Sequence, residues 1–171
     1  ASMLTLLENG ALSEAELKLK RREWSHLGSE TPVVGLTGTG GAGKSSVTDE
    51  LLNRFLHTFP NMNIAVLAVD PTRRRTGGAL LGDRIRMNSL RNDRIYMRSM
   101  ATRRQHQSTS AVLQDCIAFL KSSGFDLVLV ETAGIGQSDS EIVDLVDFPV
   151  YVMTSDYGAP SQLEKIDMIC L

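Results

Sequence analysis

Short apolar runs recur along the chain and are separated by longer stretches of mixed polarity. Within the runs the apolar residues are consecutive rather than alternating, which is typical of strands buried on both faces of a sheet. The runs occupy residues 33–37, 64–69, 95–98, 127–130 and 149–153. The stretches between them predict helices at 44–59, about 78–91, 108–123, 140–146 and 160–171. Strands that alternate with helices indicate an α/β fold, with a mainly parallel sheet flanked by helices.

The beginning of the chain has a different pattern. Residues 8–27 mix leucines with many charged side chains and predict one charged helix. Ser13, with Glu16 three residues later, has the spacing of a capping box at the start of a helix. Asn9 and Gly10 are alternative starting points for this helix.

A turn-forming stretch at 28–32, which contains glycine and proline, ends this helix. We therefore expect residues 1–30 to be a helical lead-in or linker and residues 31–171 to be the domain proper. The chain has 171 residues, of which 42% are hydrophobic and 22% charged. This is enough for one packed domain, and it excludes disorder of the whole chain.

Charge and cysteine content narrow the class of protein. A formal net charge of −2 argues against a globally basic nucleic-acid binder. Cys116 and Cys170 are too few for a disulfide scaffold and fit a reducing compartment. No apolar stretch approaches the roughly 18 residues that a membrane span needs, and residues 1–7 lack the apolar core of a secretory signal. We expect a cytoplasmic protein without nucleic-acid or membrane partners.

The first apolar run leads directly into a glycine-rich loop. Residues 38–45 read Gly-Thr-Gly-Gly-Ala-Gly-Lys-Ser and match G-x-x-x-x-G-K-[ST] in full. Glycines let the backbone turn its N–H groups toward a phosphate, and the following helix adds its positive dipole end. Lys44 is expected to neutralise the β- and γ-phosphate oxygens, and Ser45 to ligate Mg²⁺. The flanking strand and helix distinguish this P-loop from an ordinary glycine-rich turn.

Acidic residues near the ends of the predicted strands are candidates for the Mg²⁺ site, because Mg²⁺ prefers oxygen ligands. Asp70 ends the second run, and Glu131 ends the fourth, where an aspartate is commoner in nucleotide sites. Asp83 follows a glycine-containing stretch that would bring it over the metal. The alternatives are an Asx turn before Pro71 for Asp70, and a solvated helix charge or a cap for Asp83.

The residues after Glu131 resemble the acid-x-x-Gly element of nucleotide switches. In that element the N–H of Gly134 would sense a γ-phosphate. Gln137 is a candidate to position a water molecule, but it lies three residues beyond the glycine. A plain glycine loop is the alternative interpretation of this segment.

Residues 72–104 contain ten arginines but only two aspartates. Such a bias is usually a solvated face, but this segment leaves the candidate metal ligand Asp70. Arg86 lies three residues after Asp83, so one helix face would bring both toward a phosphate or Mg²⁺. The other arginines would meet an acidic partner surface or a second polyphosphate. Tyr96 is the one aromatic residue in the segment, which disfavours single-stranded nucleic acid.

Taken together, these segments resemble the GTPase chaperones of cobalamin-dependent acyl-CoA mutases. The likeness is nearest to the G-domain built into fused isobutyryl-CoA mutases, and it spans nearly all of residues 32–171. The segments that carry it are 38–46, 69–72, 75–87, 131–138 and 162–168. The family belongs to the metal-binding GTPases that use a glutamate in the switch element, which agrees with Glu131.

The resemblance implies a P-loop fold that binds GTP, GDP and Mg²⁺. It further implies that GTP hydrolysis gates or edits the loading of adenosylcobalamin, which fused or separate mutase domains bind rather than this segment. A homodimer is implied for the full protein. The family recognises guanine with an Asn-Lys-x-Asp-like element after a further strand. Because Leu171 precedes that element, we expect a C-terminally incomplete domain that lacks its last strand.

The resemblance also assigns roles to individual residues. The nucleotide would be bound by Gly40, Gly41, Ala42, Gly43, Lys44, Ser45, Ser46, Arg86 and Gly134. The Mg²⁺ ion would be held by Ser45, Asp70, Asp83, Glu131 and Thr132. The catalytic residues would be Lys44, Glu131 and Lys165, the last in a further switch that responds to the partner.

Two other functions are compatible with the motifs. One is a P-loop kinase whose arginine-rich segment binds an acidic small molecule, which phosphate release without an acceptor would exclude. The other is a non-catalytic docking module that binds little nucleotide. Calorimetry with GTP, GDP and ATP distinguishes this module from both enzymes.

Overall fold

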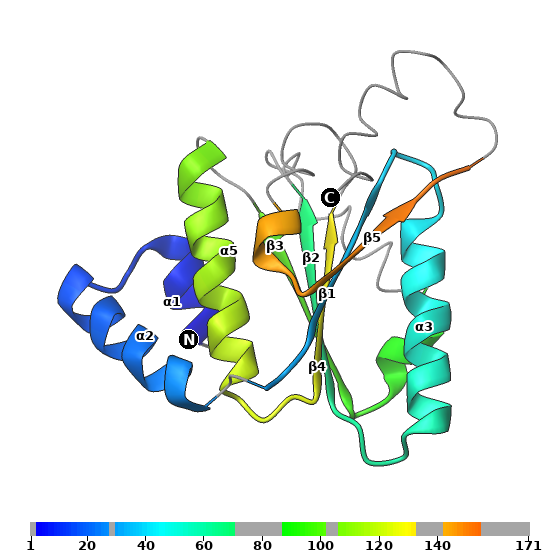
Figure 1. Ribbon diagram of the computed structural model, residues 1–171, viewed down its shortest axis with the longest axis horizontal. Helices are drawn as coiled ribbons and strands as arrows, with labels where there is room; N and C mark the ends of the chain where they lie inside the picture. Colours follow the sequence, from blue (N-terminus) through cyan, green and yellow to red (C-terminus); the bar gives the residue numbers. More distant parts are fainter. Residues whose placement is uncertain (1–2, 28–29, 71–86, 102–105, 133–141, 155–171) are drawn as a thin grey trace.

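The computed structural model describes residues 3–27, 30–70, 87–101, 106–132 and 142–154 (Figure 1). Within these residues the strands form one parallel sheet in the order β3-β2-β4-β1-β5. The strands are β1 (Val33–Gly38), β2 (Ile64–Asp70), β3 (Ile95–Ala101), β4 (Leu127–Thr132) and β5 (Phe148–Val152). Each corresponds to one of the five predicted apolar runs. The predicted parallel α/β sheet is thus confirmed.

Helices cover both faces of the sheet (Figure 1). Helix α3 (Lys44–Thr58) connects β1 to β2 on one face, and α5 (His106–Lys121) connects β3 to β4 on the other. One core cluster contains Leu36, Leu52 and Leu129 beside α3, and a second contains residues of α5 such as Leu120. Two helical layers leave the central strands little exposed, which explains why their apolar residues are consecutive.

The N-terminal segment forms two helices, so the single helix predicted over 8–27 is wrong. They are α1 (Met3–Asn9) and α2 (Glu14–Leu27). Gly10 ends α1 with a positive φ of 61°. Its N–H donates to the carbonyl of Leu7, and the N–H of Ala11 donates to the carbonyl of Leu6. This is a Schellman ending, in which a glycine in the left-handed region stops the helix.

The capping box at the start of α2 is confirmed. The backbone N–H of Ser13 donates to the Glu16 carboxylate at 2.8 Å, and the N–H of Glu16 donates to Ser13 Oγ at 3.3 Å. Two backbone donors at the helix end are thereby satisfied. The helix therefore begins after Ser13 rather than at Asn9 or Gly10.

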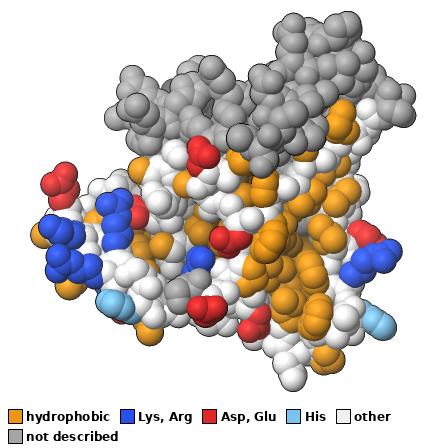
Figure 2. Space-filling view, in the orientation of Figure 1, with side chains coloured by type: hydrophobic (Ala, Val, Ile, Leu, Met, Phe, Trp, Pro, Cys, Tyr) orange, Lys and Arg blue, Asp and Glu red, His pale blue; other side chains and the backbone are white. Residues whose placement is uncertain are grey.

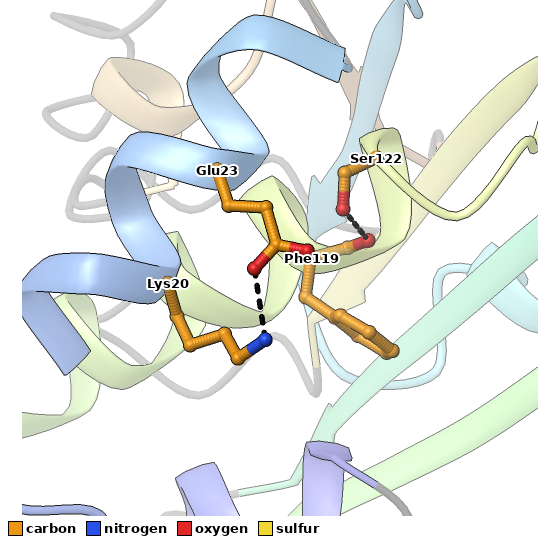
Figure 3. Close-up of polar contacts among 4 residues, drawn as sticks. All are labelled: Lys20, Glu23, Phe119 and Ser122. Carbon is orange, nitrogen blue, oxygen red and sulfur yellow. Dashed lines mark hydrogen bonds and ion pairs between the residues drawn. The ribbon is translucent and has the colours of Figure 1, made fainter. Parts of the chain in front are cut away.

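Both N-terminal helices pack against the α5 layer. Leu4, Leu7 and Trp24 are buried in the core cluster that contains the α5 residues. The Arg21 side chain of α2 donates two hydrogen bonds to the Asp115 carboxylate, at 2.6 and 2.8 Å. From the middle of α2, Lys20 and Glu23 form an ion pair close to the last turns of α5 (Figure 3). The boundary at residue 30 remains a prediction, but the preceding helices belong to the packed structure.

A buried thiol lies within the same core cluster. Cys116 on α5 is fully buried, and this burial raises its pKa to about 12. The thiol therefore stays neutral and acts as a packing group. Cys170 lies outside the described residues.

Two predicted helices are replaced by single 3-10 turns where the structure describes them. The end of the 78–91 stretch is η1 (Asn88–Arg91), and the 140–146 stretch contains η2 (Val143–Leu145). Both are short connectors into a strand, a common use of such turns. Residues 78–86 and 160–171 lie outside the described part.

Strand β5 forms one edge of the described sheet. It leaves Phe148 and Val150 exposed, and Figure 2 shows hydrophobic side chains gathered over β5 and beside α3.

In the described part of the chain, no helix is long and apolar enough to cross a membrane.

Candidate nucleotide site

The glycine-rich loop lies between the carboxyl end of β1 and the start of α3. Gly38 closes β1 with a φ of 142°, and a Cβ there would lie 2.1 Å from the carbonyl oxygen of Val152 on β5. Gly43 precedes α3 in the left-handed region, with a φ of 85°. Both positions require glycine, for contact and for backbone conformation respectively. The predicted loop thus forms at the edge of the sheet where ligands bind in such folds.

Lys44 is the first residue of α3 and is buried within the loop. Its Nζ donates hydrogen bonds to the carbonyl oxygens of Gly38 at 3.0 Å and Thr39 at 2.9 Å. A buried ammonium needs oxygen partners, and the loop backbone supplies them. The positive charge is therefore held inside the loop, close to the N-terminal end of the helix, which also attracts anions.

Glu131 lies at the carboxyl end of β4, next to the loop, because it pairs with Leu36 of β1 in the sheet register. Its carboxylate is buried and is contacted by two hydroxyl groups of α3. Ser45 Oγ donates to Oε1 at 2.6 Å, and Thr48 Oγ1 donates to Oε2 at 3.0 Å. The structure thus brings together Ser45 and Glu131, two residues that the sequence proposed for one site.

Thr48 was missed from sequence, although it lies three residues after Ser45 on the same helix face. Thr37 was missed as well. The hydroxyl of Thr132 donates to the hydroxyl of Thr37 at 3.0 Å in the buried space between β4 and β1. The proposed metal-binding role of Thr132 remains a prediction.

The other predicted site residues are placed less fully. Asp70 ends β2, where the preceding Val69 pairs with Thr132, so Asp70 is at the same edge of the sheet as Glu131. Ala42 is buried in the loop, whereas Gly40, Gly41 and Ser46 are exposed. Five candidate residues lie outside the described part of the chain, namely Asp83, Arg86, Gly134, Gln137 and Lys165.

The oxygen atoms of Ser45 and Glu131 are suitable ligands for a magnesium ion. Ser45 Oγ and Glu131 Oε1 are neighbouring oxygen atoms, and Mg²⁺ takes oxygen ligands. One hydroxyl and one carboxylate match an ion that is otherwise held by water and substrate phosphates. The described residues contain no group of three or more His, Cys, Asp and Glu side chains that could hold a metal.

The strand, the loop and the buried lysine at the head of the next helix define a P-loop nucleotide-binding protein. The particular family follows from the whole sequence. Residues 1–170 match the family described as methylmalonyl Co-A mutase-associated GTPase MeaB, and the chain belongs to this family.

Curated relatives agree with that family. The chain is 53% identical to a fused isobutyryl-CoA mutase of Geobacillus kaustophilus over 99% of its own length and 16% of the relative's. A fused isobutyryl-CoA mutase of Cupriavidus metallidurans is also 53% identical, with 15% of its length covered. A putative GTPase of Pyrococcus horikoshii is 38% identical and is covered over 52% of its length. The chain thus spans a small part of the mutases and about half of the putative GTPase.

A solved structure supports the fold. The crystal structure of an LAO/AO transport system kinase matches with a TM-score of 0.63 and 21% sequence identity. The match covers 95% of this chain and 52% of that protein. At this identity the likeness shows the shared P-loop fold alone.

Proposed function

We propose that this domain binds and hydrolyses GTP with Mg²⁺, and that hydrolysis gates or edits the loading of adenosylcobalamin onto an acyl-CoA mutase. The observation that carries the proposal is the 2.6 Å contact between Ser45 Oγ and Glu131 Oε1. It joins a hydroxyl of the phosphate loop to an acid at the end of a neighbouring strand. Family membership and the similarity to fused isobutyryl-CoA mutases support GTP as the nucleotide and the mutase as the partner.

The same proposal places the domain within a fused isobutyryl-CoA mutase. In that protein other domains bind adenosylcobalamin, and this chain supplies the nucleotide site. We expect the full protein to be a cytoplasmic homodimer with no nucleic-acid or membrane partner.

The chemistry expected of the site is the transfer of a phosphoryl group to water, by positioning and charge neutralisation. The loop N–H groups would bind the phosphates, and Lys44 Nζ would exchange its contacts with loop carbonyls for phosphate oxygens. When bound, Mg²⁺ would neutralise charge on the β- and γ-phosphate oxygens. Ser45 and Glu131 would hold that ion. Because Lys44 is buried, its attraction for an anion is less screened than at the surface.

We expect slow intrinsic turnover that the mutase stimulates. The two charged groups described at the site are already engaged, Lys44 by two carbonyls and Glu131 by two hydroxyls. Neither is therefore free to activate a water molecule in this arrangement. Phosphate release measured with and without the mutase domains tests this expectation, and a fast rate that is independent of the partner would contradict it.

The Glu131→Ala variant tests the assignment of the site. It should reduce Mg²⁺-dependent GTP turnover far more than Mg²⁺-free nucleotide binding, because the carboxylate serves the metal rather than the phosphates. Turnover is measured by phosphate release, and binding by calorimetry with GTP, GDP and ATP. Equal losses would contradict the metal-binding role. Phosphate transfer only to an added acceptor would indicate a kinase, and absence of nucleotide binding would indicate a docking module.

A further inference from the structure

We propose that Thr48 is a positioning residue that fixes the Glu131 carboxylate so that one of its oxygens faces Ser45. The inference rests on the proposed Mg²⁺-dependent GTPase function and assigns a task to a residue of α3 that lies outside the glycine-rich loop. Thr48 Oγ1 lies 3.0 Å from Glu131 Oε2, while Ser45 Oγ lies 2.6 Å from Glu131 Oε1. The two oxygens of one carboxylate are therefore divided between two hydroxyls on the same face of α3.

The hydrogen bond between Thr48 and Glu131 is needed to satisfy the Glu131 carboxylate but not the Thr48 hydroxyl. The Thr48 hydroxyl also lies 3.0 Å from the carbonyl oxygen of Lys44, one turn earlier, which is a common local partner of a helical threonine. It would be satisfied without Glu131. An ionised carboxylate can only accept hydrogen bonds, and Glu131 is 7% exposed. The Oε2 atom therefore needs a donor inside the protein, and Thr48 supplies one.

A glutamate at this position needs such support more than an aspartate does. The glutamate side chain has one more rotatable bond than aspartate, and ordering it costs more conformational entropy. Its extra methylene also carries the carboxylate farther from β4 toward α3. Anchoring of Oε2 by Thr48 limits rotation of the carboxylate and directs Oε1 toward Ser45. The Glu131–Thr48 pair is thus a preorganised support for a candidate metal ligand.

The test compares two variants that differ by one hydroxyl group, Thr48→Ala and Thr48→Ser. The measured quantity is the Mg²⁺ concentration that gives the half-maximal effect on GDP affinity, determined by titration of the purified protein. Thr48→Ala should raise this concentration about tenfold, the size expected for one lost hydrogen bond to a charged group. Thr48→Ser keeps the donor and should stay within about twofold of the wild type. Affinity for GDP without Mg²⁺ should be the same in all three proteins.

Glu131→Asp provides a second, independent measurement. A side chain one methylene shorter cannot divide its oxygens between Ser45 and Thr48 in the same way. In the Glu131→Asp background, Thr48→Ala should therefore have little further effect on the Mg²⁺ requirement, so that the two substitutions are strongly non-additive. Thr58→Ala, at the exposed last position of α3, is the matched control and should leave the Mg²⁺ requirement unchanged.

The outcomes separate this inference from the proposed function. If wild-type GDP binding does not respond to Mg²⁺, the proposed function fails. If it responds but Thr48→Ala behaves like the wild type, only the role of Thr48 is overturned. Equal effects of Thr48→Ala and Thr48→Ser would also overturn it, as would simple additivity with Glu131→Asp. Thermal unfolding of each variant shows whether it is folded. If Thr48→Ala is unstable, Thr48→Val, which keeps the shape of the side chain and lacks the donor, replaces it in both measurements and should give the same rise in the Mg²⁺ requirement.

Discussion

The carboxylate of Asp49 on α3 accepts hydrogen bonds from both the hydroxyl and the backbone N–H of Ser89, near the start of η1. Asp49 Oδ1 accepts hydrogen bonds from Ser89 Oγ at 2.5 Å and from the Ser89 N–H at 3.0 Å. The second oxygen accepts the N–H of Asn88 at 3.3 Å. These hydrogen bonds hold the start of η1 against α3, the helix that follows the glycine-rich loop.

Asp49→Ala should destabilise the protein by about 1 to 3 kcal/mol, because it removes the acceptor for a nearly buried serine hydroxyl and for two backbone N–H groups. The free energy of unfolding is measured by urea denaturation. Glu50→Ala is the matched control on the same helix, since Glu50 forms an exposed i,i+4 pair with Arg54. The control should change stability by less than about 0.5 kcal/mol. Equal effects of the two substitutions would show that the contact with Ser89 is not stabilising.

The contribution of Asp49 should also depend on pH. Burial acts to raise the pKa of Asp49, but hydrogen bonds from Ser89 and Asn88 outweigh it and leave the pKa below its ordinary value. A group whose pKa is lowered by folding stabilises the protein above the unfolded pKa, about 3.9, and loses this contribution as the pH falls toward the folded pKa. The stability difference between wild type and Asp49→Asn should therefore narrow below about pH 4. Urea unfolding from pH 7 downward measures it, and a constant difference would contradict the expectation.

The features that the sequence predicted well are those with local physical causes. Strands β1, β2 and β4 could be found because helices cover both faces of the sheet at its centre and require consecutive apolar residues. The edge strand β5 keeps a short apolar run although Phe148 and Val150 are exposed. The loop at 38–45 could be found because its residues are consecutive in the sequence, and because the left-handed backbone at Gly43 is a local requirement for glycine. The close approach of Val152 to Gly38 is not local and could not be predicted. The start of α2 could be found because Ser13 and Glu16 satisfy backbone groups of their own helix.

The features that were missed depend on partners distant in the sequence. Thr48 and Thr37 appear in the sequence as ordinary helix and strand residues, and only the fold shows that they contact Glu131 and Thr132. The prediction of one helix over 8–27 failed for a different reason. Gly10 was considered as a helix start, whereas its positive φ ends α1 and allows the two helices to pack separately.

Lys44→Ala should weaken the affinity for a non-hydrolysable GTP analogue roughly 100-fold or more, because it removes a buried cation from the loop that would bind the phosphates. Calorimetry in the presence of Mg²⁺ measures the change. Lys20→Ala, on the outer helix α2, is the control for removing one positive charge and should leave the affinity as it is. If Lys44→Ala bound the analogue as tightly as the wild type, the loop would not be the phosphate site.

Two glycines of the loop should respond to the same substitution with very different losses of stability. Gly38→Ala would place a Cβ 2.1 Å from the carbonyl oxygen of Val152 and would require an L-residue at a φ of 142°. Because β1 and β5 are paired at this point, neither backbone can move without loss of their hydrogen bonds. We expect a loss of about 3 kcal/mol or more in stability. A Cβ on Gly40 would meet no atom of the described residues within 4 Å, so Gly40→Ala should change stability by less than about 0.5 kcal/mol.

Thermal unfolding of the two variants in the absence of nucleotide checks this difference directly. Nucleotide is left out because binding to the folded state would add its own stabilisation and mask the backbone effect. A destabilised Gly38→Ala beside an unchanged Gly40→Ala would show that Gly38 is required by the contact between β1 and β5. Similar stabilities would mean that β5 does not approach β1 as closely at Val152 as the structure indicates. The glycine at position 38 would then be needed for the nucleotide alone.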